Sequence, residues 1–225
     1  MQKDLIKDII GWDVVNWSKA IEFWGNRINL KERNFKCLEL GGIKGGLSLW
    51  LALLGNQVVC SDLENPVKEA SVLLNKYKAK ATFEAIDATK IPYENHFDVI
   101  AFKSILGGIS RNNNQSLKKK TIDEIYKALN EHGILLFAEN LQASMMHKFL
   151  RKHFIKWGHE WNYLKIEEIK ELFSSFKHVN YITIGFFAAF GRNEKQRNFL
   201  GRIDQLLNPI IPQKMKYIVI GIAEK

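Results

Sequence analysis

The amino-acid sequence predicts an α/β fold built on a seven-stranded, mostly parallel sheet with helices on both faces. Three observations support this prediction. Short apolar runs alternate with amphipathic stretches through the middle of the chain, a pattern typical of parallel strands joined by covering helices. Glycine and proline stand at the boundaries between the runs, and the chain closes with two strand-like runs separated by a helical one.

The central elements follow in order. Strands are predicted where apolar residues are consecutive, and helices where they recur with helical spacing. The expected strands are 35–40, 57–61, 81–86, 97–102 and 133–138, and the expected helices are 45–54, 66–77 and 117–129. Gly55 can end the first of these helices in the left-handed conformation, and Asn65 precedes a proline suited to a first turn.

Two regions fall outside this alternation. Residues 1–34 are rich in tryptophan and are expected to form two helices ahead of the first strand. Residues 141–175 read as a long helical stretch. The runs 179–187 and 217–223 read as strands joined by a helix at 194–207, which suggests an antiparallel edge on the parallel sheet.

Composition bounds the class of protein. The chain has 225 residues, 46% hydrophobic and 25% charged, the balance of an ordinary globular domain. No apolar run approaches the roughly 18 residues of a membrane span, and residues 1–10 resemble an amphipathic helix and not a signal peptide. We therefore expect a cytoplasmic protein without membrane insertion. Cys37 and Cys60 lie in neighbouring predicted strands, where buried, reduced thiols are expected.

The net charge favours phosphate-bearing partners. Lysine and arginine total 33 against 24 acidic residues, a formal charge of +9. Such an excess suits either nucleic acid or a phosphorylated small molecule. The longest basic block, 118–120, is short.

A glycine-rich loop joins the first predicted strand to the helix after it. Gly41, Gly42, Gly45 and Gly46 follow Glu39 there, and glycines at such a junction let the backbone approach a ligand closely. One such loop is common to many nucleotide-binding folds.

Acidic residues follow at the ends of the next two strands. Asp62, followed by Leu63, ends the second strand, where a carboxylate can accept both hydroxyls of a ribose. Asp87, followed by Ala88, ends the third, where a carboxylate can accept a hydrogen bond from an adenine amino group. Together with Glu39 these acids should meet at the carboxyl edge of the sheet, where ligands bind in such folds.

This ordered series, together with Phe97-Asp98-Val99-Ile100, resembles the motifs of class I S-adenosylmethionine-dependent methyltransferases over roughly residues 35–140. The resemblance implies a Rossmann-like sheet with an antiparallel terminal strand pair and S-adenosylmethionine as the cofactor. The expected cofactor-binding residues are Glu39, Gly41, Gly42, Gly45, Asp62, Leu63, Asp87, Ala88, Lys103 and Trp17. The loop would hold the methionine part of the cofactor, Asp62 the ribose and Asp87 the adenine.

One position departs from the family pattern. Ile43 stands where a third loop glycine is usual, and the dinucleotide pattern G-x-G-x-x-G fails at the same residue. A non-catalytic, cofactor-binding domain therefore stays open as an alternative. The expected organisation is a single methyltransferase domain over 1–225, with a helical cap at 1–34, a cofactor-binding core at 35–140 and acceptor-side helices and strands at 141–225.

The methyl acceptor should be contacted by residues after the fourth and fifth strands. The segment 102–108 lacks the Asn/Asp-Pro-Pro-aromatic sequence of many enzymes that methylate nucleic-acid amines. It resembles, with the Trp- and His-rich segment near 157–161, methyltransferases of bacterial polysaccharide clusters. We therefore expect O-methylation of a small polar acceptor, such as a sugar or sugar nucleotide of surface polysaccharide synthesis. An RNA methyltransferase is the rival, and no metal site is expected.

A hydroxyl acceptor must lose a proton during transfer, which a group with a pKa near neutrality accepts best. His147 ranks first as this base, because it follows the polar end of the fifth strand. His159 ranks second, in an expected lid, and Glu139 third if burial raises its pKa. His153 lies on the apolar face of a predicted helix and is expected to be a core residue.

Overall fold

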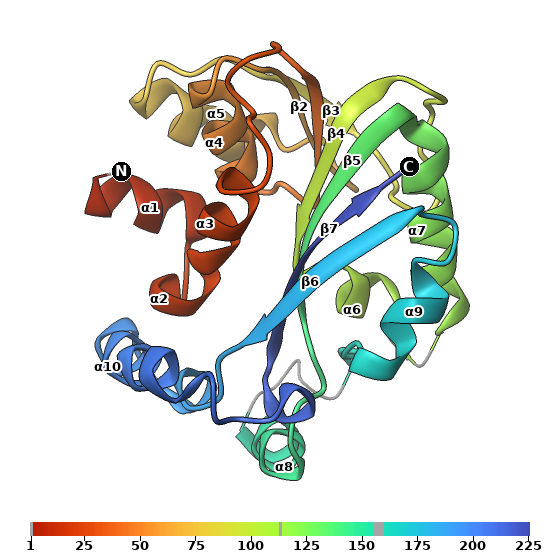
Figure 1. Cartoon of the computed structure of the whole chain (residues 1–225). Coiled ribbons are helices and arrows are strands. Elements are labelled where there is room, and N and C mark those ends of the chain that lie inside the picture. The colour runs from red at the N-terminus through yellow and green to blue at the C-terminus, as the bar shows by residue number, and fades with distance from the viewer. Residues whose placement is uncertain (1, 113, 155–159) are drawn as a thin grey trace.

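The computed structural model describes residues 2–112, 114–154 and 160–225, and it contains a seven-stranded sheet (Figure 1). From one edge to the other the strands are β3 (Thr82–Ala85), β2 (Gln57–Asp62), β1 (Lys36–Leu40), β4 (Phe97–Lys103), β5 (Leu129–Asn140), β7 (Ile218–Glu224) and β6 (His178–Ile184). The first five pair in parallel, whereas β7 is antiparallel to both β5 and β6. The predicted fold class is confirmed.

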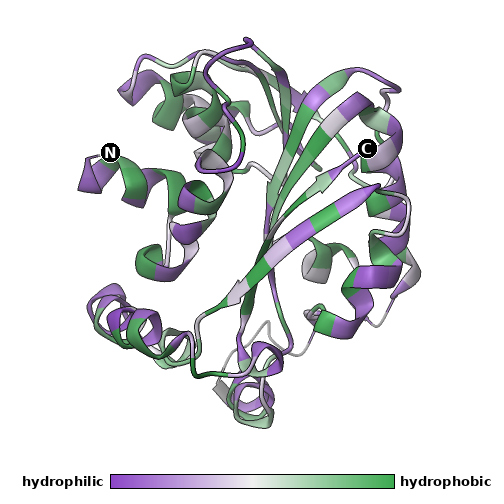
Figure 2. Cartoon of the chain, viewed as in Figure 1, coloured by the Kyte–Doolittle hydropathy of each residue, from purple (hydrophilic) through white to green (hydrophobic). Residues whose placement is uncertain are grey.

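Helices cover both faces of the sheet. One face carries α4 (Gly46–Leu53) and α5 (Val67–Lys76), and the other carries α7 (Ser116–Ala128) and α9 (Ile169–Leu172). Two large apolar clusters result, one on each face, and the strands between them are predominantly hydrophobic (Figure 2). Cys37 and Cys60 are free and fully buried within this core, as predicted.

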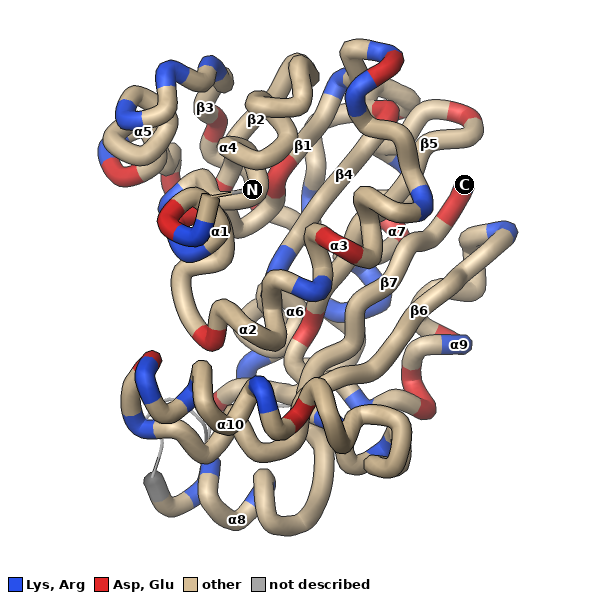
Figure 3. Tube along the Cα trace, turned by 60° about the vertical axis from the view of Figure 1, so that its left-hand side comes forward, with Lys and Arg blue, Asp and Glu red and all other residues tan. Residues whose placement is uncertain are grey.

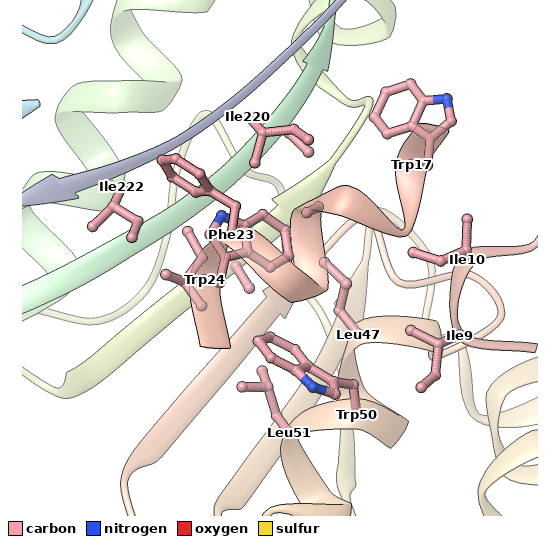
Figure 4. Packing of buried hydrophobic residues seen from close by; sticks show 14 of the residues in the cluster. Ile9, Ile10, Trp17, Phe23, Trp24, Leu47, Trp50, Leu51, Ile220 and Ile222 are labelled. Atoms are coloured by element: carbon pink, nitrogen blue, oxygen red, sulfur yellow. The ribbon is translucent and has the colours of Figure 1, made fainter. Parts of the chain in front are cut away.

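The N-terminal region forms three short helices and not the two predicted. They are α1 (Lys3–Ile10), α2 (Val14–Trp17) and α3 (Lys19–Gly25). The first break lies at Gly11 and Asp13, which both have positive φ and therefore leave the right-handed helix. These helices pack on α4 and on the sheet, so that Trp24 and Trp50 meet with ring centroids 5.7 Å apart (Figure 4).

The predicted long helix at 141–175 is wrong. The structure has α8 (Met145–Phe154), a short 3-10 turn η2 (Ile166–Glu168) and α9 in this stretch. Leu164 exchanges backbone hydrogen bonds with the end of β5, from its amide to Asn140 O and to its carbonyl from the amide of Gln142. Extended pairing there takes the backbone groups that a continuous helix would need.

The remaining elements gather at the carboxyl edge of the parallel strands. They include α6 (Leu106–Ile109) directly after β4, α8 after β5, and α10 (Glu194–Leu207) between β6 and β7 (Figure 1). The 3-10 turns η3 (Ala188–Phe190) and η4 (Gln213–Met215) flank α10. None of the helices in the described ranges is long and apolar enough to cross a membrane.

Candidate active site

The glycine loop forms a tight turn between β1 and α4. Gly41 and Gly45 have φ of +72° and +67°, a region that side chains rarely adopt. A Cβ at Gly46 would lie 2.1 Å from the carbonyl oxygen of Ile9. The loop therefore needs glycine for two reasons, backbone conformation and the close approach of α1.

Glu39, near the end of β1, fixes this loop by hydrogen bonds to the start of α4. Its buried carboxylate accepts hydrogen bonds from the amides of Leu47 and Ser48, at 3.1 and 2.7 Å, in the first turn of α4. A helix N-terminus is where dinucleotide folds place a pyrophosphate. Here that anion position is occupied by a side chain of the protein, so the loop is suited to a cofactor without phosphate at this point.

The two strand-end acids lie beside each other at the carboxyl edge. Asp62 and Ala85 are register partners, and the amide of Ile86 donates to the Asp62 carbonyl at 2.7 Å. Partial burial raises the pKa of Asp62, opposed by hydrogen bonds from the amides of Leu63 and Ile43. Leu63 itself is 70% exposed and free to cover a ligand.

Asp87 is exposed and shaped by a local turn. Its carboxylate accepts from the amide and the hydroxyl of Thr89, both at 2.8 Å. Ala88, between them, is half-buried. Asp62 and Asp87 therefore both keep acceptor capacity toward a ligand at this edge, as a ribose and an adenine amino group require.

Lys103, at the end of β4, lies between aromatic rings and buried acids. Its Nζ is 4.8 Å from the ring centroid of Trp17 and 5.2 Å from that of Trp12. Desolvation lowers the pKa of Lys103 to about 8, against the opposing charges of Glu39, Asp13 and Glu139. Within the part of the chain that the structure describes, Lys103 Nζ makes no hydrogen bond or ion pair. Its ammonium is therefore available to a ligand.

The Trp17 side chain is more deeply buried than a residue that lines an open pocket. It is fully buried, and its Nε1 has no hydrogen-bond acceptor among the residues described. The structure thus brings Trp17 to Lys103, and its direct contact with a cofactor stays a prediction.

Glu139, near the end of β5, is fully buried next to α6. Its carboxylate accepts from the amides of Leu106 and Asn140, each at 2.8 Å. Despite these bonds, desolvation raises the pKa of Glu139 to about 7. Next along β5, the Asn140 side chain donates to the Ser104 hydroxyl at 2.5 Å. Two groups with near-neutral pKa values, Lys103 and Glu139, thus share one edge of the sheet.

His147 lies on α8 within an aromatic cluster and is 1% exposed. Its Nδ1 lies 2.7 Å from the Ser144 hydroxyl and its Nε2 2.9 Å from the Phe186 carbonyl oxygen. Burial lowers the pKa of His147 to about 4. Both ring nitrogens are therefore already engaged, and a role as base stays a prediction. His159 lies outside the described residues. His153 is exposed on α8, so the prediction that it is a core residue is wrong.

A buried polar network escaped the sequence analysis. Asp13, 1% exposed, accepts a hydrogen bond from the Tyr217 hydroxyl, and burial raises the pKa of Asp13 to about 7. Asn16 donates to Tyr217 and to Asp204, at 2.9 and 2.8 Å. The four residues join the N-terminal helices to β7 and α10, and no local pattern marks them because their partners are distant in the chain.

Across the described ranges, no cluster of three His, Cys, Asp or Glu side chains could hold a metal.

Comparison with known proteins begins with the sequence. A family model described as a methyltransferase domain matches residues 31–185, more than half of the chain. No curated protein sequence matches.

Solved structures share the fold at low sequence identity. A putative methyltransferase from Bacillus halodurans is 13% identical, with a TM-score of 0.63 over 93% of this chain and 98% of that one. The [4+2]-cyclase SpnF is 15% identical, with a TM-score of 0.62 over 92% and 80%. A Haemonchus contortus phosphoethanolamine N-methyltransferase 2, solved with S-adenosyl-L-methionine, is 16% identical, with a TM-score of 0.60 over 93% and 52%. These likenesses concern the fold, which hosts more than one chemistry.

Proposed function

The chain belongs to the methyltransferase domain family with S-adenosylmethionine as its cofactor, and we propose that it methylates a hydroxyl group of a small polar acceptor. A sugar or sugar nucleotide of surface polysaccharide synthesis is the first acceptor class to test. The observation that supports this proposal is the presence of both Lys103 and Glu139, two buried groups with near-neutral pKa values, at the carboxyl edge, because a hydroxyl acceptor needs a base.

The residues present fit the cofactor. The glycine loop would hold the methionine part of the cofactor, and the N-terminus of α4 needs no phosphate because Glu39 already accepts its first amides. Asp62 would accept the ribose hydroxyls and Asp87 the adenine amino group. When bound, the cofactor supplies an electrophilic methyl group on a sulfonium. The protein aligns the acceptor oxygen with it, which is the main part of such catalysis.

Glu139 is our proposed base. It is fully buried, and the loss of hydration raises its pKa to about 7, close to the value that favours proton transfer at neutral pH. The Lys103 ammonium, whose charge is offset in part by Glu139 and Glu39, would stabilise negative charge that develops on the acceptor oxygen. His147 and His159 stay the other candidates.

The charge distribution favours a small acceptor over RNA. Figure 3 shows Lys and Arg spread over many elements, with Asp and Glu interspersed. A nucleic-acid surface usually concentrates its basic residues along one face. Filter binding of bulk RNA at two salt concentrations tests the rival, because phosphate contacts give a steep salt dependence. Tight, salt-sensitive binding would favour RNA.

The decisive experiment is methyl transfer from labelled cofactor to a panel of nucleotide sugars (UDP-glucose, UDP-galactose and GDP-mannose), with bulk RNA as a parallel substrate. With any productive acceptor, the rate should rise with pH through about 7 as Glu139 ionises, and fall through about 8 as Lys103 loses its proton. Glu139→Gln should lose at least ~100-fold in single-turnover rate and the lower limb of the profile.

A purely structural role for Glu139 would look different. The Glu139→Gln variant would then lose stability, because the new carboxamide presents an NH₂ group to one of two amide donors, but its pH profile would keep the lower limb. Binding of S-adenosylhomocysteine, measured by calorimetry, controls for an intact cofactor site. Full activity in Glu139→Gln would exclude it as the base.

A further inference from the structure

A basic cavity lies beside the candidate active site and is not used by the proposed base or the cofactor residues. Its volume is about 400 Å³, and it lies between α8, η3 and the start of α10. Three arginines line it, with His147 and apolar groups between them, and no acidic residue is among the described residues of the lining. The lining residues are His147, Leu150, Arg151, Ala189, Phe190, Gly191, Arg192 and Arg197.

Arg151 is a buried cation without a carboxylate partner in the described chain. It is 8% exposed, and its Nη1 donates to the carbonyl oxygens of Leu141 and Gln142 at 2.8 and 3.2 Å. Its guanidinium stacks on Tyr163, 3.9 Å from the ring centroid. No acidic side chain among the described residues pairs with Arg151. Buried charges in proteins are ordinarily paired, so the missing partner points to an anion from outside the chain.

The other two arginines surround the opening. Arg192 is exposed, and among the residues that the structure describes its side chain has no hydrogen-bond or ion-pair partner that would hold it elsewhere. Arg197 pairs with Glu194 at 2.8 Å, at partial exposure. The planar fork of guanidinium groups matches the oxygens of phosphate. Among the described residues no carboxylate pairs with Arg151 or Arg192, so the cavity keeps positive charge for an anionic group.

The cavity lies near the candidate active site, with the Trp12 ring between Arg197 and Lys103. The Arg197 guanidinium carbon lies 5.9 Å from the Trp12 ring centroid, and Lys103 Nζ lies 5.2 Å from the same centroid. Figure 3 shows the neighbouring helices α8 and α10 carrying basic residues at this end of the molecule. The cavity therefore lies next to the edge where methyl transfer is proposed.

We propose that the cavity lined by Arg151, Arg192 and Arg197 binds a phosphate group of the methyl acceptor. The acceptor is thereby a phosphorylated small molecule, held by its phosphate near α8 while its hydroxyl points toward Lys103 and Glu139. This inference rests on the proposed methyl transfer for its role, but phosphate binding itself does not depend on that reaction.

The test is titration of inorganic phosphate into the protein at fixed ionic strength, followed by calorimetry and by the side-chain NMR signals of the arginines. Saturable binding that moves the Arg151 signal is expected. Arg192→Ala should weaken it at least ~10-fold, which is about 1.4 kcal/mol, and Arg192→Lys less. Arg202→Ala removes the same charge from an exposed position of α10 outside the cavity, and should change affinity less than twofold.

Three results would overturn the proposal. The first is the absence of saturable phosphate binding, and the second is equal weakening by Arg192→Ala and Arg202→Ala. The third is an equal loss of S-adenosylhomocysteine affinity in Arg192→Ala, which would assign the cavity to the cofactor carboxylate. Phosphate binding that persists while no acceptor on the panel is methylated would instead count against the proposed function alone.

Discussion

The region 35–140 and the regions on either side of it build their parts of the site in different ways. In 35–140 two of the candidate cofactor residues are fixed by residues close to them in the sequence, Glu39 by the first turn of α4 and Asp87 by Thr89. In the flanking regions the bonds span the chain, as between Tyr217 and Asp13, which are 204 residues apart. Local motifs therefore predict the site residues of the first region well, but they do not predict the bonded network of the flanking regions.

The largest expected effect comes from breaking a contact between the two flanking regions, 1–34 and 141–225. Trp24 is fully buried, and its indole Nε1 donates to the Gly221 carbonyl at 2.9 Å. Trp24→Ala should lower the free energy of unfolding by about 3–5 kcal/mol, because it leaves a large cavity and an unpaired carbonyl. Chemical denaturation measures it, with Trp12→Ala, at a residue that is 36% exposed, as the control. A loss of less than about 1 kcal/mol would mean that the N-terminal helices stabilise the sheet little.

A smaller effect is expected on cofactor binding by residues 35–140. Asp62→Ala should weaken S-adenosylhomocysteine binding ~10–100-fold, since each charge-assisted hydrogen bond contributes roughly 1.5–3 kcal/mol. Its stability should change little, because the carboxylate is only partly buried. Glu64→Ala, two residues on and exposed, is the matched control in calorimetry. Unchanged affinity in Asp62→Ala would remove the ribose assignment.

The smallest effect concerns the pH dependence of stability, through the buried network that contains Asp13 and Tyr217. Burial raises the pKa of Asp13 from 3.8 to about 7, so the folded state holds a proton that the unfolded state releases. Stability should therefore fall as pH rises from about 4 through 7, and stay lower above it. Asp13→Asn removes this penalty and should gain roughly 2–4 °C in Tm over wild type for each kcal/mol of penalty removed at pH 8, and less at pH 5.

The pH comparison has its own control. Asp123→Asn changes an exposed carboxylate on α7, and its difference from wild type should be similar at the two pH values. If the Tm difference between Asp13→Asn and wild type is also similar at the two pH values, Asp13 is already ionised at low pH in the folded protein. Its negative charge then does not destabilise the buried network.

The sequence predicts features that depend on neighbouring residues and misses those that depend on residues distant in the chain. Alternation and glycine placement predicted the sheet, its antiparallel edge and α10, and placed Asp62 and Asp87 at one edge, because strand period and turn chemistry are local. The helix expected at 141–175 failed because Leu164 pairs with the end of β5, a tertiary contact with no local signal. For Glu139, the raised pKa depends on complete burial under α6. The arginines of the basic cavity lie on segments that only the fold brings together. The division into cap, core and acceptor side stays a prediction.

The hydrogen bond from Trp24 to Gly221 can form only late in the synthesis of the chain. The two residues are 197 positions apart, and ribosomes add about 5–20 residues per second, so the N-terminal helices wait on the order of 10–40 seconds for their strand. During that interval Phe23 and Trp24 of α3, both buried in the finished protein, have no β7 to cover them. The nascent chain is thus a natural client for chaperones that shield apolar segments, and slow codons late in the message would lengthen its exposure.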